Sequence, residues 1–431
     1  MNKTPLRAPV FEPIIVEDNL KDGYWIQAVD VDGDGTIDLV ASGLAVGEVV
    51  WYHNPSWRKR IIAQFPKPVA LDAGDVAGAG FNDLVVCHDY GNCMFNCGPD
   101  DGKISWLRNP GSGSRDTAWE TRHVGNLVAT HRLRLGDFTH SGNLDILALP
   151  VVGPQGGRGA VHSPARLTLF RRPQDVFCAK PWADEIVNES DFRVVHDVLV
   201  SRFTSSDAPS SESVLLATEE GVSWFGFCAG GDWRHITLGQ GEVTQFETTG
   251  FRGSGNVSFG RIGEDAYAYL PAIEPFHGNT LAIYTKEKSD LLTIRWKRQI
   301  LDVFGDPNEH GEGAGHHVVA ADFDGDGDDE FLVALRGPMP WQGVFYYKAI
   351  DLDEGLWTKT RISSSSAARI AVADFDQDGR LDFATTGYYT PGYFLADHPQ
   401  VLVFYNRFGE ARPDLVCPSL PWVPAPGRAR Q

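Results

Sequence analysis

The sequence predicts an all-β fold: a single seven-bladed β-propeller that is closed by its N-terminal strand. Three repeated segments support this prediction, namely a hairpin with a polar loop, a short aromatic strand, and a further strand that usually begins with Trp. The hairpin and the aromatic strand occur seven times each, and the Trp segment occurs six times. Four short strands per repeat are typical of propellers, in which every blade buries its faces against its neighbours.

The hairpin is clearest at residues 316–337, which read HHVVAADFDGDGDDEFLVALRG. Its loop carries carboxylates at positions 1, 3, 5 and 9, namely Asp322, Asp324, Asp326 and Glu330. Gly327 permits the sharp turn, so these oxygens can converge on a hard cation such as Ca²⁺. The flanking residues alternate as they do in strands, which indicates a calcium-type hairpin of the FG-GAP/VCBS kind and not an EF-hand.

Two further loops keep all four carboxylates, and the other copies are eroded. The complete copies are DVDGDGTID, with Asp30, Asp32, Asp34 and Asp38, and DFDQDGRLD, with Asp374, Asp376, Asp378 and Asp382. The sequence therefore predicts structural Ca²⁺ or Mg²⁺ in three hairpin loops. The copies at Asp75 and Asp137 keep only the first and last acids, so we expect these turns to fold without metal. The copies at Arg202 and Arg261 have lost the acids.

The Trp segments account for the outer strands of six blades, from WRKRIIAQF to WTKTRISSS. The missing seventh copy is FEPIIVEDN at residues 11–19, which can form the outer strand of the last blade. Blades cannot bury their faces alone, so the sequence predicts one propeller domain over residues 1–410. Residues 411–431 are rich in Pro and are expected to form an extension.

The composition excludes some kinds of partner. With 57 acidic and 38 basic residues, the chain has a formal net charge of -19 and no basic cluster, so neither nucleic acid nor an anionic membrane is expected to bind it. No apolar run reaches the length that spans a bilayer. The N-terminus MNKTPLRAPVFEP lacks the apolar core of a secretory signal. An intracellular protein is expected, unless a signal has been removed or is unconventional; the pattern does not predict an oligomeric state.

Three of the six cysteines lie close together in the segment CHDYGNCMFNC, at Cys87, Cys93 and Cys97. Their number is too small for a disulfide framework in a chain of 431 residues. The sequence favours reduced, partly buried thiols. A structural Zn²⁺ or a local disulfide are the alternatives.

Histidines gather at one end of the predicted innermost strands. The residue six places before each loop's first position begins the strand that lines the central channel, and these residues are Tyr24, Val69, His131, His196, Gly255, His316 and Ala368. The loops that follow the second strands return to the same face and carry His88, Tyr90, His277, Tyr388 and Tyr389. Neutral imidazoles from four blades suit Zn²⁺ or a similar transition ion, so His131, His196, His277 and His316 are the predicted ligands. The alternative is that each imidazole only hydrogen-bonds a neighbouring strand.

The chain also resembles a known family. The segments GFNDLVVCHDYG, KISWLRNPG, THRLRLGDFT, PFHGNTLAIYTK and TPGYF are similar to the propeller domain of fungal aldos-2-ulose dehydratase, also called 1,5-anhydro-D-fructose dehydratase. The resemblance runs from about Phe11 to Tyr405. The cupin and lectin-like domains that follow the propeller in this family have no counterpart in the sequence.

The resemblance implies a carbon–oxygen lyase that removes water from a keto sugar, with Zn²⁺ at the bottom of a cleft and Ca²⁺ or Mg²⁺ elsewhere. The four predicted histidine ligands fall on histidines of the family's motifs, and Tyr90 and Arg132 also match. His88 stands where the family has an acid.

A β-elimination needs a base, an acid and a group that stabilises the developing enolate. Residue type and position predict His88 or Tyr90 as the base and Tyr389 as the acid, with Arg132 stabilising negative charge. Two alternatives remain: a polysaccharide or glycoside lyase that cleaves at a uronate, for example of the rhamnose-glucuronate lyase type, and a non-catalytic carbohydrate-binding propeller. A lectin would repeat similar binding residues in many blades. Here different residues gather at one axial end, which favours catalysis on a carbohydrate.

Overall fold

A computed structural model describes residues 7–91, 93–94, 97–111, 118–156, 163–178, 180–201, 212–244, 250–287 and 295–409. Within these ranges the chain forms strands and no helix, and no helix that could cross a membrane is found there. The predicted extension at residues 411–431 and the loop position Arg202 lie outside the described residues.

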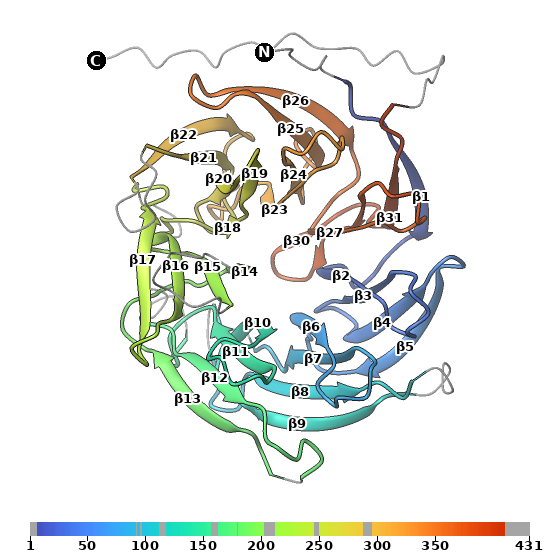
Figure 1. The fold of residues 1–431 in the computed structure, drawn as a ribbon, viewed down its shortest axis with the longest axis vertical. Helices are drawn as coiled ribbons and strands as arrows, with labels where there is room; N and C mark the ends of the chain where they lie inside the picture. Colours follow the sequence, from blue (N-terminus) through green and yellow to red (C-terminus); the bar gives the residue numbers. More distant parts are fainter. Residues whose placement is uncertain are drawn as a thin grey trace.

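The strands form seven antiparallel sheets around a central axis, as Figure 1 shows. Blade 1 contains β2 (Trp25–Val29), β3 (Asp38–Ser42), β4 (Glu48–His53) and β5 (Arg58–Gln64), and blade 2 contains β6 (Ala70–Gly74), β7 (Asp83–His88), β8 (Lys103–Arg108) and β9 (Glu120–Asn126). Blade 3 contains β10 (Thr130–Gly136), β11 (Asp145–Pro150), β12 (Leu167–Arg171) and β13 (Ala183–Asn188), and blade 4 contains β14 (Asp197–Ser201), β15 (Ser213–Thr218), β16 (Gly221–Phe227) and β17 (Trp233–Gly239).

The remaining three blades complete the ring. Blade 5 has an additional short strand and contains β18 (Asn256–Val257), β19 (Gly260–Ile262), β20 (Asp265–Glu274), β21 (Thr280–Lys286) and β22 (Trp296–Val303). Blade 6 contains β23 (Gly315–Ala321), β24 (Glu330–Leu335), β25 (Gly343–Asp351) and β26 (Leu356–Ser363), and blade 7 contains β27 (Arg369–Ala373), β28 (Asp382–Thr386), β31 (Val401–Asn406) and β1 (Phe11–Glu17). A small hairpin of β29 (Tyr389–Thr390) and β30 (Phe394–Leu395) follows β28. The predicted seven-bladed propeller is confirmed.

The N-terminal strand closes the ring. β1 pairs antiparallel with β31, in a register that places Phe11 opposite Asn406, and it forms the outer edge of blade 7 (Figure 1). The ring of Phe11 also packs edge-on against the rings of Phe323 and Phe383. The first strand is therefore held by a ladder of backbone hydrogen bonds and by aromatic contacts to blades 6 and 7.

Burial explains why the second strands of the blades are mostly apolar while the outer strands are more polar. Every residue of β7, β11, β15 and β24 is buried, because both faces of these strands contact neighbouring blades. Most residues of the outer strands β5 and β9 are instead exposed or partly buried. Outer strands therefore carry the charges, and the inner strands supply the interblade core.

Buried asparagines at the ends of third strands link neighbouring blades. Asn54 of blade 1 donates its side-chain amide to the carbonyl of Ile37 in its own blade and to that of Phe375 in blade 7. Asn109 makes the same connection from blade 2 to Val31 of blade 1. Because Asn54 is 1% exposed, the groups it satisfies have no access to water. The seam between the first and last blades is thus stabilised by hydrogen bonds as well as by β1.

The cysteine cluster differs from the favoured prediction. Cys93 and Cys97 form a disulfide, whereas Cys87 is a free, fully buried thiol at the inner part of β7. The two cysteines are four residues apart in the sequence, a spacing that does not by itself require a disulfide.

Candidate metal centre in the central channel

Three buried histidines meet at one end of the channel. His196 directly precedes the innermost strand β14, and His316 lies at the start of β23. His277 lies in the turn that follows β20, with a φ of +47°. A non-glycine residue adopts this left-handed conformation at a cost of roughly 1–3 kcal/mol, so the surrounding structure must hold His277 in place.

The ring nitrogens of these three histidines converge. His196, His277 and His316 each offer one nitrogen, and the three atoms lie within 4.8 Å of one another. Nδ1 of His196 lies 2.6 Å from the carbonyl oxygen of Gly255, and Nδ1 of His316 lies 2.5 Å from that of Ala368. A carbonyl only accepts, so both Nδ1 atoms carry hydrogen and both Nε2 atoms keep a lone pair.

The third imidazole is oriented by a charged pair. Nδ1 of His277 lies 3.4 Å from Glu312 Oε1, and Arg336 donates to the other oxygen of Glu312 at 2.9 Å. Burial raises the pKa of Glu312, but Arg336 and His277 outweigh this effect and lower it to about 2. Glu312 is therefore an ionised carboxylate behind the imidazole, an arrangement common behind metal-bound histidines.

The cluster is neutral. Burial lowers the pKa of His277 to about 4, with a further contribution from Arg336, and burial with Arg132 lowers the pKa values of His196 and His131 well below the usual range. The pKa of His316 is lowered for the same reason, chiefly by burial. A neutral imidazole is the form that binds a metal ion.

The donor set fits a divalent transition ion. Within the described residues, Nε2 of His277 and Nε2 of His316 are buried atoms without a hydrogen-bond partner. A lone pair buried in this way costs free energy unless it finds a donor or a metal. Three imidazoles with an open fourth position suit Zn²⁺ or a similar ion. The residues that would hold it are His196, His277 and His316.

The fourth predicted ligand, His131, lies beside this group with different partners. Its ring stacks on that of His196, with centroids 5.3 Å apart. Its Nε2 atom lies 2.9 Å from the hydroxyl of Tyr24 and accepts a hydrogen bond from Arg132 at 3.1 Å. Arg132 also donates to the Tyr24 hydroxyl at 3.1 Å. The structure therefore separates three converging imidazoles from a His131–Tyr24–Arg132 network that adjoins them.

A small cavity of 20 Å³ lies next to the cluster. Its lining includes His131, His277, Tyr24, Tyr90, Tyr388 and Tyr393. Such a volume has room for about one water molecule. Tyr393, in the turn between β29 and β30, packs against His277 with ring centroids 5.9 Å apart, so this hairpin covers the histidines in this structure.

The acidic loops use their first and last carboxylates to fold. In blade 1, Asp30 accepts from the backbone N–H groups of Gly33 and Gly35, and Asp38 accepts from those of Val31 and Asn54. The eroded loop in blade 2 keeps the same bonds, because Asp75 accepts from Gly80 and other backbone N–H groups. This explains why positions 1 and 9 persist in loops that have lost the other acids.

The middle carboxylates meet basic side chains from the third strand. In blade 6, Nζ of Lys348 lies 2.7 Å from Asp324, from Asp326 and from Glu330. An ammonium group thus stands among three of the four predicted ligands, and Ca²⁺ would have to displace it. Asp322, Asp324 and Glu330 each offer an oxygen within 4.8 Å of the others, so the calcium site in this loop stays a prediction. Asp322, the fourth, accepts from the backbone of Gly327.

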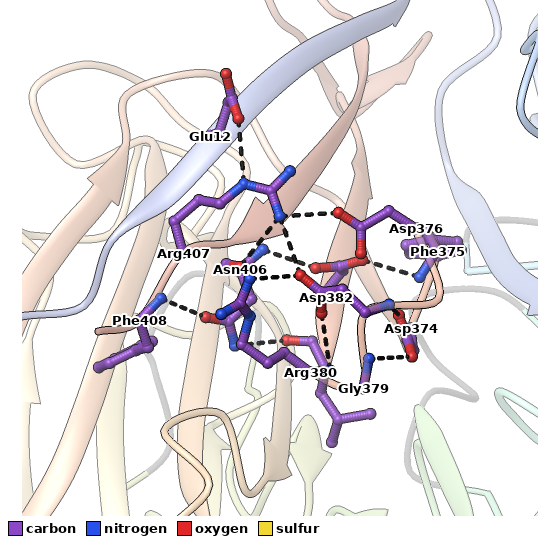
Figure 2. A network of polar contacts seen from close by, with 12 residues as sticks. Glu12, Asp374, Phe375, Asp376, Gly379, Arg380, Asp382, Asn406, Arg407 and Phe408 are labelled. Atoms are coloured by element: carbon purple, nitrogen blue, oxygen red, sulfur yellow. Dashed lines mark hydrogen bonds and ion pairs between the residues drawn. The ribbon is translucent and has the colours of Figure 1, made fainter. Parts of the chain in front are cut away.

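In blades 7 and 1 a different side chain takes the place of the lysine beside the loop carboxylates. Figure 2 shows Arg407 reaching into the last loop, where it donates to Asp376 at 2.8 Å and to Asp378 at 3.2 Å, while its Nε atom donates to Glu12 of β1. In blade 1 the corresponding residue is His53, whose Nε2 lies 3.3 Å from Asp32 Oδ2. Imidazole is not a permanent cation, so the loop with Asp30, Asp32, Asp34 and Asp38 is the one where a divalent ion still fits best.

Comparisons with known proteins agree with the fold and with the residue pattern. Residues 101–287 match the family model "Aldos-2-ulose dehydratase, beta-propeller domain". The chain is 33% identical to aldos-2-ulose dehydratase of Phanerodontia chrysosporium over 428 residues, which cover 93% of this chain and 46% of that protein. The predicted resemblance to the aldos-2-ulose dehydratase propeller is confirmed. The chain spans about half the length of this relative.

A solved structure is similar in fold alone. An ancestral GH74 enzyme matches with a TM-score of 0.51 at 11% identity, over 88% of this chain and 46% of that one. This likeness supports the propeller architecture and carries no information on chemistry.

The predicted acid and base residues lie differently from what the sequence suggested. His88 does not line the cavity: its Nδ1 lies 2.5 Å from Asp89, its Nε2 lies 2.8 Å from Ser105, and its ring stacks on Phe65. Both ring nitrogens are thus engaged within blade 2. Tyr389 also lies outside the lining, and Lys21 Nζ lies 5.3 Å from its ring. Tyr90 does line the cavity, as the match to the dehydratase motif suggested.

Four residues near the cluster were not predicted as functional: Tyr24, Glu312, Arg336 and Tyr388. Tyr24 occupies the same strand-start position as the histidines, and Tyr388 precedes Tyr389 on a loop that the sequence places on the correct face. Tyr24 and Tyr388 could therefore have been predicted from their positions in the repeat. Arg336 directly follows the second strand of blade 6, so its repeat position also indicates the correct face. Glu312 comes from the segment between β22 and β23, and no spacing rule in the sequence indicates that it meets His277.

Proposed function

We propose that this propeller is a carbon–oxygen lyase that removes water from a keto sugar by β-elimination at the channel end lined by the histidines. The observation that carries the proposal is the group of three neutral imidazoles with two unpartnered Nε2 atoms, adjoining the hydrogen-bonded Tyr24, His131 and Arg132. The similarity to aldos-2-ulose dehydratase supports it, since that protein's name specifies dehydration of an aldos-2-ulose.

A divalent ion at His196, His277 and His316 would supply Lewis-acid polarisation of the sugar carbonyl. The protein's own residues have distinct tasks around it. Arg132 donates to the Tyr24 oxygen, and the same hydroxyl lies 2.9 Å from His131 Nε2, so Tyr24 is held beside the imidazoles as the proposed group that accepts the proton next to the carbonyl. The guanidinium is 1% exposed, so it acts in a site from which water is largely excluded.

Tyr388 is suited to the opposite role. Burial raises the pKa of its phenol, so the hydroxyl keeps its proton near neutral pH and can donate it to the departing oxygen. Its ring lies 5.0 Å from that of His316, and the Arg336 guanidinium lies 5.1 Å from the Tyr388 ring. Tyr24 as base and Tyr388 as acid thus replace His88 and Tyr389 in the proposed mechanism, because they lie beside the imidazoles. Tyr90, the other predicted base, also lines the cavity, but burial raises the pKa of its phenol, so its hydroxyl keeps its proton.

The covered cavity favours a small substrate over a polymer. A volume of 20 Å³ does not hold a sugar ring, so the β29–β30 hairpin with Tyr393 must move for a monosaccharide to enter. A polysaccharide would need a groove open at both ends. The uronate-cleaving alternative is therefore the second candidate, and a non-catalytic binding propeller is the third.

The proposal is tested by the absorbance of the conjugated product. The purified protein, supplied with Zn²⁺ and other divalent ions in parallel, is incubated with 1,5-anhydrofructose, with glucosone and with uronate-bearing polysaccharides, and near-UV absorbance is followed. Growth of absorbance with a keto sugar supports the dehydratase. Growth only with the polysaccharides would establish the lyase instead, and no change with any substrate in metal-replete protein would refute elimination chemistry.

A further inference from the structure

A second cavity lies in the central channel, in front of a layer of charged residues. Its volume is 240 Å³, far more than the ~10–15 Å³ that one water molecule requires. All seven innermost strands contribute to its wall, from Trp25 in blade 1 to Arg369 in blade 7. Gln27, Leu199 and Val319 on this wall are partly exposed, so the cavity opens toward the face that carries the acidic loops.

Three guanidinium groups gather around one indole at this cavity. The ring of Trp25 has Arg369 at 3.8 Å, Arg132 at 5.1 Å and Arg134 at 5.4 Å from its centroid. Contacts of this kind hold cations in place by cation–π attraction. Arg134 and Arg369 line the cavity itself, whereas Arg132 faces the histidines. The two cavity arginines repel each other electrostatically, and this contributes with burial to a lowered pKa of Arg369.

The acids in the wall neutralise these arginines only in part. Asp72 accepts from Gln27 and from the backbone N–H of Leu135, so both of its oxygens have other hydrogen-bond donors. Asp197 accepts from Asn256 through Oδ2, and its Oδ1 forms an ion pair with Arg369 at 3.6 Å, which is longer than a hydrogen bond. Within the described residues, Asp197 Oδ1 is a buried oxygen without a hydrogen-bond partner.

A further donor completes the wall. His317 accepts a hydrogen bond from the backbone N–H of Ile370 at its Nδ1, which leaves Nε2 as a hydrogen donor. Arg134 uses one of its nitrogens on the carbonyl of Leu133 and keeps its other donors. The cavity thus presents Arg134, Arg369 and His317 as donors that outnumber the free acceptors around them.

We propose that this cavity is a binding site for a small oxyanion, a carboxylate or a phosphate, whose several oxygens can accept hydrogen bonds from both arginines. Arg134 and Arg369 supply charge-assisted hydrogen bonds, and such an anion would relieve the repulsion between them. The site is separate from the proposed elimination centre, because Arg132 and Trp25 lie between the two. The inference does not depend on the proposed enzymatic reaction.

Isothermal titration of the full chain at constant ionic strength tests this site, with inorganic phosphate in one arm and acetate or succinate in the others. A net charge of -19 keeps general adsorption of anions weak, so saturable binding of one anion per chain is the expected result. The arm with the tightest binding identifies whether the oxyanion is a phosphate or a carboxylate.

Four variants test where the anion binds. R369Q and R134Q should each weaken anion binding at least about tenfold. If R369Q does not fold because Arg369 is buried, R134Q alone tests the site. The exposed R234Q is the matched control and should bind as the unmodified protein does. H196A should also retain binding. No saturable binding of any of these anions, unchanged binding in both R369Q and R134Q, or loss of binding in H196A alone would overturn the proposal.

Discussion

The Nζ atom of Lys348 lies 2.7 Å from Oε1 of Glu330, inside one of the three loops that keep all four carboxylates of the calcium-type motif. Glu330 is fully buried, and the same ammonium also contacts Asp324 and Asp326. The lysine extends from β25, the third strand of the blade, and neutralises carboxylates that repel one another. The ammonium group of Lys348 therefore supplies positive charge to the acidic loop.

Replacing Lys348 with Met should make this loop dependent on calcium. Removal of one partner of a buried ion pair costs roughly 3–5 kcal/mol, because the remaining charges are left uncompensated. We expect K348M to unfold at a lower temperature and millimolar Ca²⁺ to recover part of the loss, as measured by thermal unfolding with and without chelator. K297M, at an exposed position, is the control. Equal stabilisation of the unmodified protein and K348M by Ca²⁺ would show that the lysine does not occupy the ion's place.

The loop in blade 1 should respond differently. Asp32 faces His53 and not a permanent cation, so we expect Ca²⁺ or Mg²⁺ to stabilise the unmodified protein through Asp30, Asp32, Asp34 and Asp38. D34N should abolish this shift in thermal unfolding while leaving Lys348 and its loop unaffected. A persistent Ca²⁺-induced shift in D34N would assign the ion to another site.

Substitution of the histidines should distinguish the metal ligands from His131, which lies beside them. H196A and H316A are expected to lose the transition ion, since each removes one of three converging nitrogens. H131A is expected to keep it, because His131 Nε2 is engaged by Tyr24 and Arg132. Metal content per chain by elemental analysis is the measurement, with the half-exposed H235A as control. Loss of the ion from H131A to the same degree would restore the four-ligand prediction.

Substitution of Tyr24 should separate catalysis from binding. Y24F removes the hydroxyl that Arg132 and His131 contact and changes little in volume, so we expect kcat to fall roughly 10²–10⁴-fold with a nearly unchanged KM. Y389F should leave both constants close to those of the unmodified protein, since Tyr389 lies outside the cavity lining. The opposite ranking of the two variants would favour the sequence-based assignment.

Removal of the N-terminal strand β1 should destabilise the propeller, because this strand closes the ring. Removing residues 1–17 deletes β1 and exposes the edge of β31, so the protein should unfold at a markedly lower temperature and aggregate. Removing residues 1–9 spares the strand and is the control. Calorimetry and size-exclusion chromatography report the two effects, and identical profiles for the two truncations would refute a closing role for β1.

The blades and the histidine end could be predicted because both follow from a local pattern that repeats. A fixed offset from each loop places His131, His196 and His316 at the same height, whatever the rest of the chain does. Counting outer strands sufficed to assign Phe11–Glu17 to the last blade. These inferences use neighbouring residues in one strand, where pleat and register decide direction.

Contacts between different strands could not be predicted from a pattern that repeats within single strands. Whether Lys348 points into the loop of Asp324 depends on the twist and register of β24 and β25, because the two residues lie 24 positions apart in the sequence. Glu312 reaches His277 from an irregular segment, whose path no periodicity fixes. His88 and Tyr389 lie on the predicted face but turn toward Asp89 and Lys21, respectively.

Consecutive residues at the start of the innermost strands serve the two ends of the channel: His131 precedes Arg132, His196 precedes Asp197, and His316 precedes His317. Asp197 and His317 line the larger cavity, and Arg132 contacts the ring of Trp25 in its wall. A slip of one residue in any of these strands would therefore change both the side chain that reaches the histidines and the side chain that reaches the larger cavity. A substitution can alter one of the two sites alone, whereas an insertion or deletion here would disturb both together.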